Sequence, residues 1–288
     1  MEICVAKNAG ACYGVSRSLD VVERARNVSE KIATLGDLIH NPLVIDDLKK
    51  SGVESVESVS EAKDKGIEKL IIRSHGISLE ILNELKNTDI EIVDATCPYV
   101  KNVSNAASLL ASLYPAVIIV GKNGHPEVEG VASYICDAGA KCFIGENSEE
   151  INRFLPELKE LNDSVGVVSQ TTQSVEVFED MVKYLKDNGV KVEVENTICV
   201  ATKKRQESAA ELAKQVDAML VIGGHNSSNT NHLADLCKEN CEKVFHIESV
   251  EELKGVDLSS INKLGITAGA STPKSQIDKI LDEIKTMS

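Results

Sequence analysis

Aromatic side chains are scarce in this chain of 288 residues: they make up 3% of it, and tryptophan is absent. This scarcity argues against a stacking platform for single-stranded nucleic acid and against the aromatic belt of a membrane protein. The longest apolar runs, at 116–120 and 218–222, are as long as a strand and far too short for a membrane span. The first ten residues lack a basic region followed by an apolar one, so we expect no signal peptide and a cytoplasmic protein.

Positive charge is also in short supply, with 31 Lys and Arg against 45 Asp and Glu and a net charge of −14. DNA and RNA are therefore poor partners, because their phosphates would be repelled. An anionic small substrate would have to be held by a local reversal of charge. The chain has eight cysteines but no CxxC pair, and it lacks both the GxGxxG and the P-loop motifs. Zinc fingers, thioredoxin-type sites and the common nucleotide-binding loops are thus excluded, and reduced cytoplasmic thiols favour metal binding, catalysis or burial.

Short β-branched runs alternate with amphipathic stretches along the whole chain. Strands are expected at 69–74, 90–96, 116–121, 164–170, 191–197, 218–224 and 263–269. Helices are expected at 78–87, 102–113, 175–189 and 202–216. This alternation is typical of α/β units with parallel sheets, in which ligands bind beyond the carboxyl ends of the strands, next to helix N-termini.

A threefold repeat underlies this pattern. Cys12, Cys97 and Cys199 each end an apolar run and begin a helical pattern, and a polar residue follows each after 28 positions (40 − 12, 125 − 97, 227 − 199). These second residues are His40, His125 and Ser227, and a third set comprises His75, Thr171 and Ser271. We therefore predict three α/β units: 1–97 with the N-terminal strand, 98–195, and 196–288 with a C-terminal helix.

The three cysteines point to a metal centre. A helix N-terminus favours the ionised thiol, which is the form that binds metal. Three thiolates, one from each unit, would leave one coordination position open, as in catalytic centres. Five cysteines have no equivalent in the other units: Cys4, Cys136, Cys142, Cys237 and Cys241. The last two are four residues apart on a helix and could hold a metal, but core packing is favoured.

The polar residues form a donor-rich set that suits an anion. Its members share positions at strand ends or helix starts: His40, His75, His125, Thr171, Thr172, Ser227, Ser228, Asn229 and Ser271. Helix N-termini add partial positive charge, which offsets an anion locally. Glu127 follows His125 by two positions, and a carboxyl shielded from water beside an anion is a candidate proton donor. The alternative, an acidic residue that suits the helix dipole, stays open from the residues alone.

Taken together, these motifs resemble the 4-hydroxy-3-methylbut-2-enyl diphosphate reductase family, also called IspH or LytB. The matching segments cover nearly the whole chain, in the order ACYGV, HNP, RSHG, DATCP, GKNGHPEVEG, SQTT, NTICVAT, GGHNSSNT and GITAGAST. Two positions depart from the family's pattern. Ala11 stands where Phe is often found, and His225 stands where Lys is common.

The resemblance implies three α/β units in a trefoil-like arrangement around a [4Fe-4S] cluster, with Cys12, Cys97 and Cys199 as ligands and one open iron. It implies a diphosphate pocket formed by His40, His75, Ser227, Ser228, Asn229 and Ser271. His125 would connect the diphosphate to the proton relay, Glu127 would supply the proton, and Thr171 would be its partner near the substrate hydroxyl. The implied reaction is the final step of the methylerythritol phosphate pathway: reductive loss of an allylic hydroxyl as water, which gives isopentenyl and dimethylallyl diphosphates.

The resemblance also implies ferredoxin or flavodoxin as a transient electron donor. Because such donors are acidic like this chain, docking needs a local basic patch, for which Lys203, Lys204 and Arg205 are the candidates. A solvated helix face is an equally good interpretation of these three residues. The alternative for the whole chain is a binding or sensor protein whose thiolates hold a non-catalytic cluster or zinc. Such a protein would not need a carboxyl proton donor and a phosphate cage.

Overall fold

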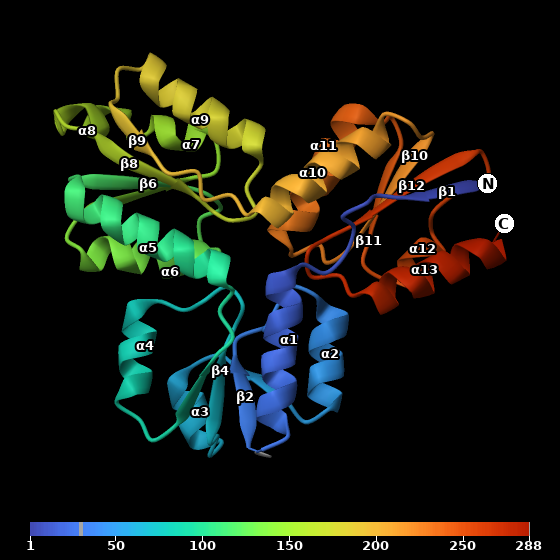
Figure 1. Cartoon of the computed structure of the whole chain (residues 1–288), viewed down its shortest axis with the longest axis horizontal. Coiled ribbons are helices and arrows are strands. Elements are labelled where there is room, and N and C mark those ends of the chain that lie inside the picture. The colour runs from blue at the N-terminus through green and yellow to red at the C-terminus, as the bar shows by residue number, and fades with distance from the viewer. Residues whose placement is uncertain (29–30, 288) are drawn as a thin grey trace. The chain divides into compact units, whose positions relative to one another are not determined.

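The computed structural model describes residues 1–28 and 31–287, which contain three four-stranded sheets (Figure 1). All strand pairs are parallel, which confirms the expected α/β class. The chain divides into two compact units. Unit 1 comprises Met1–Ser16, Ile39–Asp46 and Val200–Ser288, and unit 2 comprises Arg17–Leu38 and Asp47–Cys199. Helices α1 (Tyr13–Arg26) and α2 (Pro42–Lys50) begin in the residue ranges of unit 1 and end in those of unit 2.

Unit 1 contains one sheet, with the order β1-β12-β10-β11. Its strands are β1 (Glu2–Val5), β10 (Ala218–Ile222), β11 (Val244–Ile247) and β12 (Lys263–Ala268). Its helices are α10 (Val200–Ala213), α11 (Ser228–Asn240), α12 (Val250–Leu253) and α13 (Lys274–Met287). Along β10 the side chains alternate, so that Leu220 packs in the core with α13 while Met219 packs in the core with α10 and α11. Burial on both faces explains why this strand is apolar throughout.

The first sheet of unit 2 has the order β3-β2-β4-β5. Its strands are β2 (Ile32–Leu35), β3 (Glu54–Val56), β4 (Lys69–Ile72) and β5 (Glu91–Asp94). Helices α3 (Val59–Asp64) and α4 (Leu79–Lys86) pack on the face that Leu70 and Ile72 line. The expected strand at 90–96 thus ends at Asp94, and the chain then leaves the sheet towards Cys97.

The second sheet of unit 2 has the order β7-β6-β8-β9. Its strands are β6 (Ala116–Val120), β7 (Lys141–Gly145), β8 (Val165–Ser169) and β9 (Val192–Val194). One face carries α5 (Pro98–Leu113) and α6 (Pro126–Asp137), and the other carries α7 (Ser148–Asn152), α8 (Leu155–Glu160) and α9 (Val175–Asp187) (Figure 1). On β6, Ile119 faces the first pair of helices and Ile118 faces the second group.

The three sheets share one strand order, and this order explains the repeat. In each sheet an outer strand precedes a cysteine: β1 precedes Cys12, β5 precedes Cys97 and β9 precedes Cys199. The two central strands precede the polar residues of the second and third sets. The 28-residue spacing therefore covers the helix after each cysteine and the first central strand of another sheet: α1 and β2, α5 and β6, or α10 and β10.

The N-terminal strand was expected to belong with residues 1–97, but β1 pairs with β12 through the register Glu2↔Lys263 to Val5↔Ile266. It therefore completes the sheet formed by the last third of the chain. The division into three units at residues 97 and 195 stays a prediction. Within the described part of the chain, no helix is both long enough and apolar enough to span a membrane.

Candidate active site

The three cysteines occupy equivalent backbone positions. The N–H of Cys12 donates to Ala270 O, that of Cys97 to Ser74 O and that of Cys199 to Thr171 O, each at 3.0 Å. Each acceptor lies in the loop after the neighbouring central strand, within one residue of the third-set position of that sheet. The same hydrogen bond thus ties the cysteine loop to the adjacent loop in all three sheets.

Each of these cysteines immediately precedes a helix. Cys97 is the N-cap of α5, and the Sγ of Cys12 lies 3.5 Å from the backbone N of Val15 in the first turn of α1. All three side chains are partly exposed, and none of the eight cysteines, all of which are described, forms a disulfide. An accessible thiol at a helix N-terminus is suited to act as a ligand of an iron–sulfur cluster.

Three of the other cysteines lie in environments that disfavour a metal ligand. Burial raises the pKa of Cys142 and of Cys237 to about 12, so both thiols stay protonated at neutral pH. Cys237 and Cys241 both lie in the hydrophobic core beneath α10 and α11. Core packing is therefore confirmed as the explanation for this pair.

Glu127 lies at the start of α6, directly after the N-cap His125 and Pro126. The backbone N–H of Glu127 donates to Nδ1 of His125 at 3.1 Å, so this ring nitrogen acts as an acceptor. The carboxylate is bound by one residue from the loop after β8. Its Oε1 accepts the N–H of Thr171 at 2.6 Å, and its Oε2 accepts the Thr171 hydroxyl at 2.8 Å.

The Glu127 carboxyl is withdrawn from water, with 2% of the residue exposed. Burial raises its pKa to about 7, against the two hydrogen bonds from Thr171, which lower it. A carboxyl with this pKa can both hold and release a proton at neutral pH. This environment differs from that of a solvated acid placed only to suit a helix dipole.

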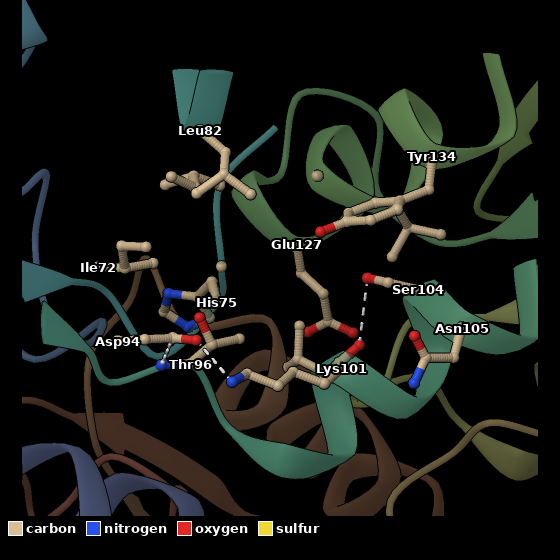
Figure 2. A pocket seen from close by; sticks show the side chains of 15 residues that line it. Ile72, His75, Leu82, Asp94, Thr96, Lys101, Ser104, Asn105, Glu127 and Tyr134 are labelled. Atoms are coloured by element: carbon tan, nitrogen blue, oxygen red, sulfur yellow. Dashed lines mark hydrogen bonds and ion pairs between the residues drawn. The ribbon is translucent and has the colours of Figure 1, made fainter. Parts of the chain in front are cut away.

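Two histidines accompany Glu127 in unit 2. The rings of His75 and His125 meet edge to face, with their centroids 5.4 Å apart. Figure 2 shows the Glu127 side chain extending from α6 into a cavity that His75 also lines. Unit 2 thus contains the predicted proton donor, its hydrogen-bonding partner and two of the predicted site histidines.

Unit 1 contains the larger group of predicted anion ligands. Ser227 is the N-cap of α11, and its Oγ accepts the N–H of Thr230 at 3.4 Å. Ser228 and Asn229 are the first residues of this helix, and both are buried. The amide oxygen and nitrogen of Asn229 have no hydrogen-bond partner among the described residues. Buried polar atoms of this kind are rare unless a ligand or water satisfies them, so Asn229 fits an anion-binding role.

The loops around these residues pass close to one another. The Ser271 hydroxyl donates to the backbone O of His40 at 2.9 Å. A Cβ at Gly224 would lie 2.8 Å from the same oxygen, which explains the glycine before the HNSSN segment. The predicted site residues in unit 1 are therefore Cys12, His40, Ser227, Ser228, Asn229 and Ser271, and those in unit 2 are His75, Cys97, His125, Glu127, Thr171 and Cys199.

The structure corrects the predicted basic patch. Arg205 is buried, with 3% exposed, and donates to Gly10 O at 2.7 Å and to Ala201 O at 3.2 Å. It therefore orders the backbone before Cys12 and cannot contact a partner protein. Lys203 and Lys204 remain exposed. The error arose because a run of charges usually marks a solvated helix face, and the sequence does not show which member of the run faces inwards.

Gln170 is a buried residue that sequence reasoning missed, although it belongs to the SQTT segment. Its Oε1 accepts the N–H of Lys122 at 3.1 Å, which joins the loop after β8 to the loop after β6. Its position immediately before Thr171 was the available signal.

Comparisons with known proteins identify the family of this chain. The family model described as LytB protein matches residues 3–285. A 4-hydroxy-3-methylbut-2-enyl diphosphate reductase of Geotalea uraniireducens is 41% identical over 99% of this chain and 97% of its own length. The enzyme of the same name from Caldanaerobacter subterraneus subsp. tengcongensis is 40% identical over 100% of this chain and 98% of its own.

Two solved structures are also similar. One is an (E)-4-hydroxy-3-methyl-but-2-enyl diphosphate reductase described as the terminal enzyme of the non-mevalonate pathway, with 38% identity, a TM-score of 0.70, and coverage of 99% of this chain and all of that one. The other, the E-1-hydroxy-2-methyl-but-2-enyl-4-diphosphate reductase of Plasmodium falciparum, has 26% identity, a TM-score of 0.86, and coverage of 98% and 87%. The match of the family model and of these relatives over nearly the full length shows that the chain belongs to the LytB protein family.

Proposed function

We propose that Glu127 is the proton donor in the reaction of this chain, which is a 4-hydroxy-3-methylbut-2-enyl diphosphate reductase and acts at the terminal step of the non-mevalonate pathway. The observation that carries this proposal is the environment of Glu127: a buried carboxyl, a pKa of about 7, and both oxygens held by Thr171. A general acid is most effective when its pKa lies near the working pH.

The reaction consumes two electrons and two protons. The bond between carbon and the allylic hydroxyl breaks, and one proton leaves with that oxygen as water. The second proton forms the new C–H bond, whose position distinguishes isopentenyl from dimethylallyl diphosphate. Hydroxide is a poor leaving group, so an acid beside the hydroxyl lowers the barrier to bond breaking.

Family membership implies an iron–sulfur cluster. The proposed ligands are Cys12, Cys97 and Cys199, because the same hydrogen bond positions each of them at the start of a helix. When bound, a [4Fe-4S] cluster with one open iron would supply the electrons and a Lewis-acid position for the hydroxyl oxygen.

The diphosphate is proposed to bind at the N-terminus of α11. Ser227, Ser228 and Asn229 offer hydroxyl and amide groups there, and the helix end adds partial positive charge. The further proposed ligands are His40, His75, His125 and Ser271. Because the diphosphate is unchanged by the reaction, these contacts serve to hold the C–O bond in place for reaction.

Anaerobic purification tests whether the protein binds an iron–sulfur cluster or zinc. We expect a brown protein that contains iron and sulfide, and loss of both when Cys97 is replaced by Ser. The matched control Cys136→Ser, at an exposed cysteine in α6, should keep the colour. A colourless protein with one equivalent of zinc would favour a non-catalytic metal centre instead.

The electron donor is proposed to be ferredoxin or flavodoxin, docking at the exposed Lys203 and Lys204 on the helix after Cys199. Replacing both lysines by Glu should slow turnover several-fold with a protein donor at low salt, because the remaining charge of the chain is repulsive. Turnover with a small chemical reductant should not change. Equal loss with both reductants would instead indicate damage near the cluster.

A further inference from the structure

Glu127 has no direct contact with bulk water through which it could regain a proton. The residue is 2% exposed, and its partner Thr171 is 6% exposed. The Thr171 hydroxyl already donates to Oε2, and its backbone N–H donates to Oε1. A donor that releases one proton in each turnover must be recharged, so a route from the surface has to reach this carboxyl.

A cavity of about 280 Å³ inside unit 2 reaches Glu127 (Figure 2). It lies between the loop after β4, helix α4, the start of α5 and helix α6. Among the described residues, its lining includes Glu127 and His75 but neither Thr171 nor any cysteine. Thr171 is therefore not part of the cavity wall, and none of the proposed cluster ligands lines the cavity, although Thr96, which directly precedes Cys97, does.

The lining of the cavity is polar enough to stabilise ordered water. Ile72, Ile77, Val100 and Val131 form apolar parts of the wall, while other lining residues carry hydroxyl, amide or charged groups: Asp94, Thr96, Lys101, Ser104, Asn105 and Tyr134. A purely apolar cavity stays dry, whereas polar groups on several sides stabilise ordered waters, and a volume of this size holds several of them.

The outer part of the cavity is exposed and carries paired charges. Lys101 Nζ lies 2.5 Å from Asp94 Oδ2, and their side chains are 48% and 41% exposed. The other oxygen of Asp94 accepts the N–H of Thr96 at 2.9 Å. Because Lys101 and Asp94 neutralise each other, no unpaired charge is left here to select an ionic ligand. Water is the occupant that fits.

We propose that this cavity holds the water chain through which Glu127 regains its proton from the protein surface, entering beside Lys101 and Asp94. The proposal rests on the function of Glu127 proposed above. After Glu127 has given its proton to the leaving hydroxyl, a cavity water donates a proton to the carboxylate. That water in turn accepts one from the next water, and the last water accepts one from a buffer acid or hydronium ion outside. Only O–H bonds break and form, and no oxidant or reductant is needed.

Blocking the cavity tests this route. Ser104 is buried in α5 and lines the cavity, and Asn105 lines it from an exposed position on the same helix. Ser104→Leu fills the interior, and Asn105→Leu blocks the outer part without changing the core. Leucine is a good helix former, so α5 should persist. Matched controls are Ser108→Leu and Asn102→Leu, which lie on α5 outside the lining.

With the cluster-loaded enzyme and a small chemical reductant at pH 8, both cavity variants should lower kcat by about tenfold and leave kcat/KM nearly unchanged, because recharging the general acid follows the chemical step. The solvent deuterium isotope effect on kcat should rise, and imidazole buffer should partly restore kcat. Crystals of the wild type should show ordered waters leading to the Glu127 carboxyl, and Ser104→Leu should lack them. Controls should match the wild type.

The outcomes separate the two proposals. If Glu127→Gln lowers kcat but both cavity variants behave like their controls in kcat and isotope effect, the water route is overturned and the proton donor stands. If Glu127→Gln itself turns over normally, the proposed role of Glu127 fails, and the water route fails with it. A dry cavity in the wild-type crystal also overturns the route.

Discussion

Helices α6 and α11 begin at corresponding places in their sheets, yet they offer different chemistry. Each follows a central strand, and each N-cap, His125 or Ser227, lies 28 residues after a cysteine (125 − 97, 227 − 199). The second residue of the helix is Glu127 in α6 and Asn229 in α11. Both oxygens of Glu127 have partners, whereas neither polar atom of the Asn229 side chain has one among the described residues.

The difference originates in the loop after the neighbouring central strand, which is β8 in unit 2 and β12 in unit 1. In unit 2 this loop supplies Thr171, whose N–H and hydroxyl both reach Glu127. In unit 1 the corresponding Ser271 donates its hydroxyl to the backbone O of His40, and the side-chain amide of Asn229 has no partner among the described residues. The same backbone arrangement thus places two different groups at the helix start. In α6 it is the hydrogen-bonded carboxyl of Glu127, which can exchange a proton, and in α11 it is the amide of Asn229, which is unpaired within the described part of the chain and can bind a ligand.

The largest expected effect comes from Glu127→Gln. Glutamine keeps the shape and can hydrogen-bond to Thr171, but its amide does not release a proton near neutral pH. We expect kcat to fall by about a hundredfold or more, with KM nearly unchanged and the cluster retained. Steady-state kinetics with a chemical reductant measure this, with Glu129→Gln, an exposed acid on the same helix, as the control. A similar loss in both variants would mean that charge at the start of α6, and not the proton, matters.

Asn229→Ala should give the opposite pattern. Removal of an amide that binds the diphosphate costs about 1–3 kcal/mol, which corresponds to a KM roughly 5 to 150 times higher, while kcat changes less. Binding of inorganic diphosphate should weaken in parallel. Asn240→Ala, at the last residue of α11, is the control. A large fall in kcat with unchanged KM would remove the contrast between the two helices.

Many of the strands and helix starts in this comparison could be predicted from the sequence, but not all of them. The apolar strand Ala116–Val120 and the position of Cys97 before a helix follow from local pattern, because burial on both faces demands continuous apolar residues. Outer strands are harder to predict from the sequence. β3 (Glu54–Val56) has three residues, only one of them fully buried, so it carries little periodic signal.

Partners that are distant in the sequence could not be predicted from spacing alone. The hydrogen bonds from Thr171 to Glu127 join residues 44 positions apart, and β1 pairs with β12 across nearly the whole chain. The burial of Arg205 depends on the carbonyl of Gly10, 195 positions away. Local sequence sets helix starts and strand faces, whereas these contacts depend on which loops the fold brings together.

Thr171→Val tests whether the hydroxyl of Thr171 lowers the pKa of Glu127. The backbone N–H of residue 171 still reaches Oε1, but the hydroxyl bond to Oε2 is lost. Because that bond stabilises the carboxylate and lowers the pKa of Glu127, its removal should raise the pKa further. The decline of kcat at alkaline pH should move to higher pH, with a several-fold lower maximum. Thr171→Ser, which keeps the hydroxyl, should leave the pH profile in place.

The smallest effect should appear in stability, and its sign follows from the raised pKa of Glu127. Between the ordinary value of 4.5 and about 7, the folded protein holds a proton that the unfolded chain has released. Stability from this group is therefore complete below about pH 4.5 and is lost as the pH rises through 7.

Glu127→Gln removes this dependence, because glutamine does not ionise. Relative to the wild type, the variant should gain stability on going from pH 5 to pH 8, by an amount on the order of 1–3 kcal/mol. Thermal melting of the cluster-loaded proteins at the two pH values measures the difference, which should shift Tm by a few degrees. Asn229→Ala is the control, because it changes no ionisable group and should show no pH-dependent gain in stability. An equal gain in both variants would mean that the buried carboxyl of Glu127 does not cause the pH dependence.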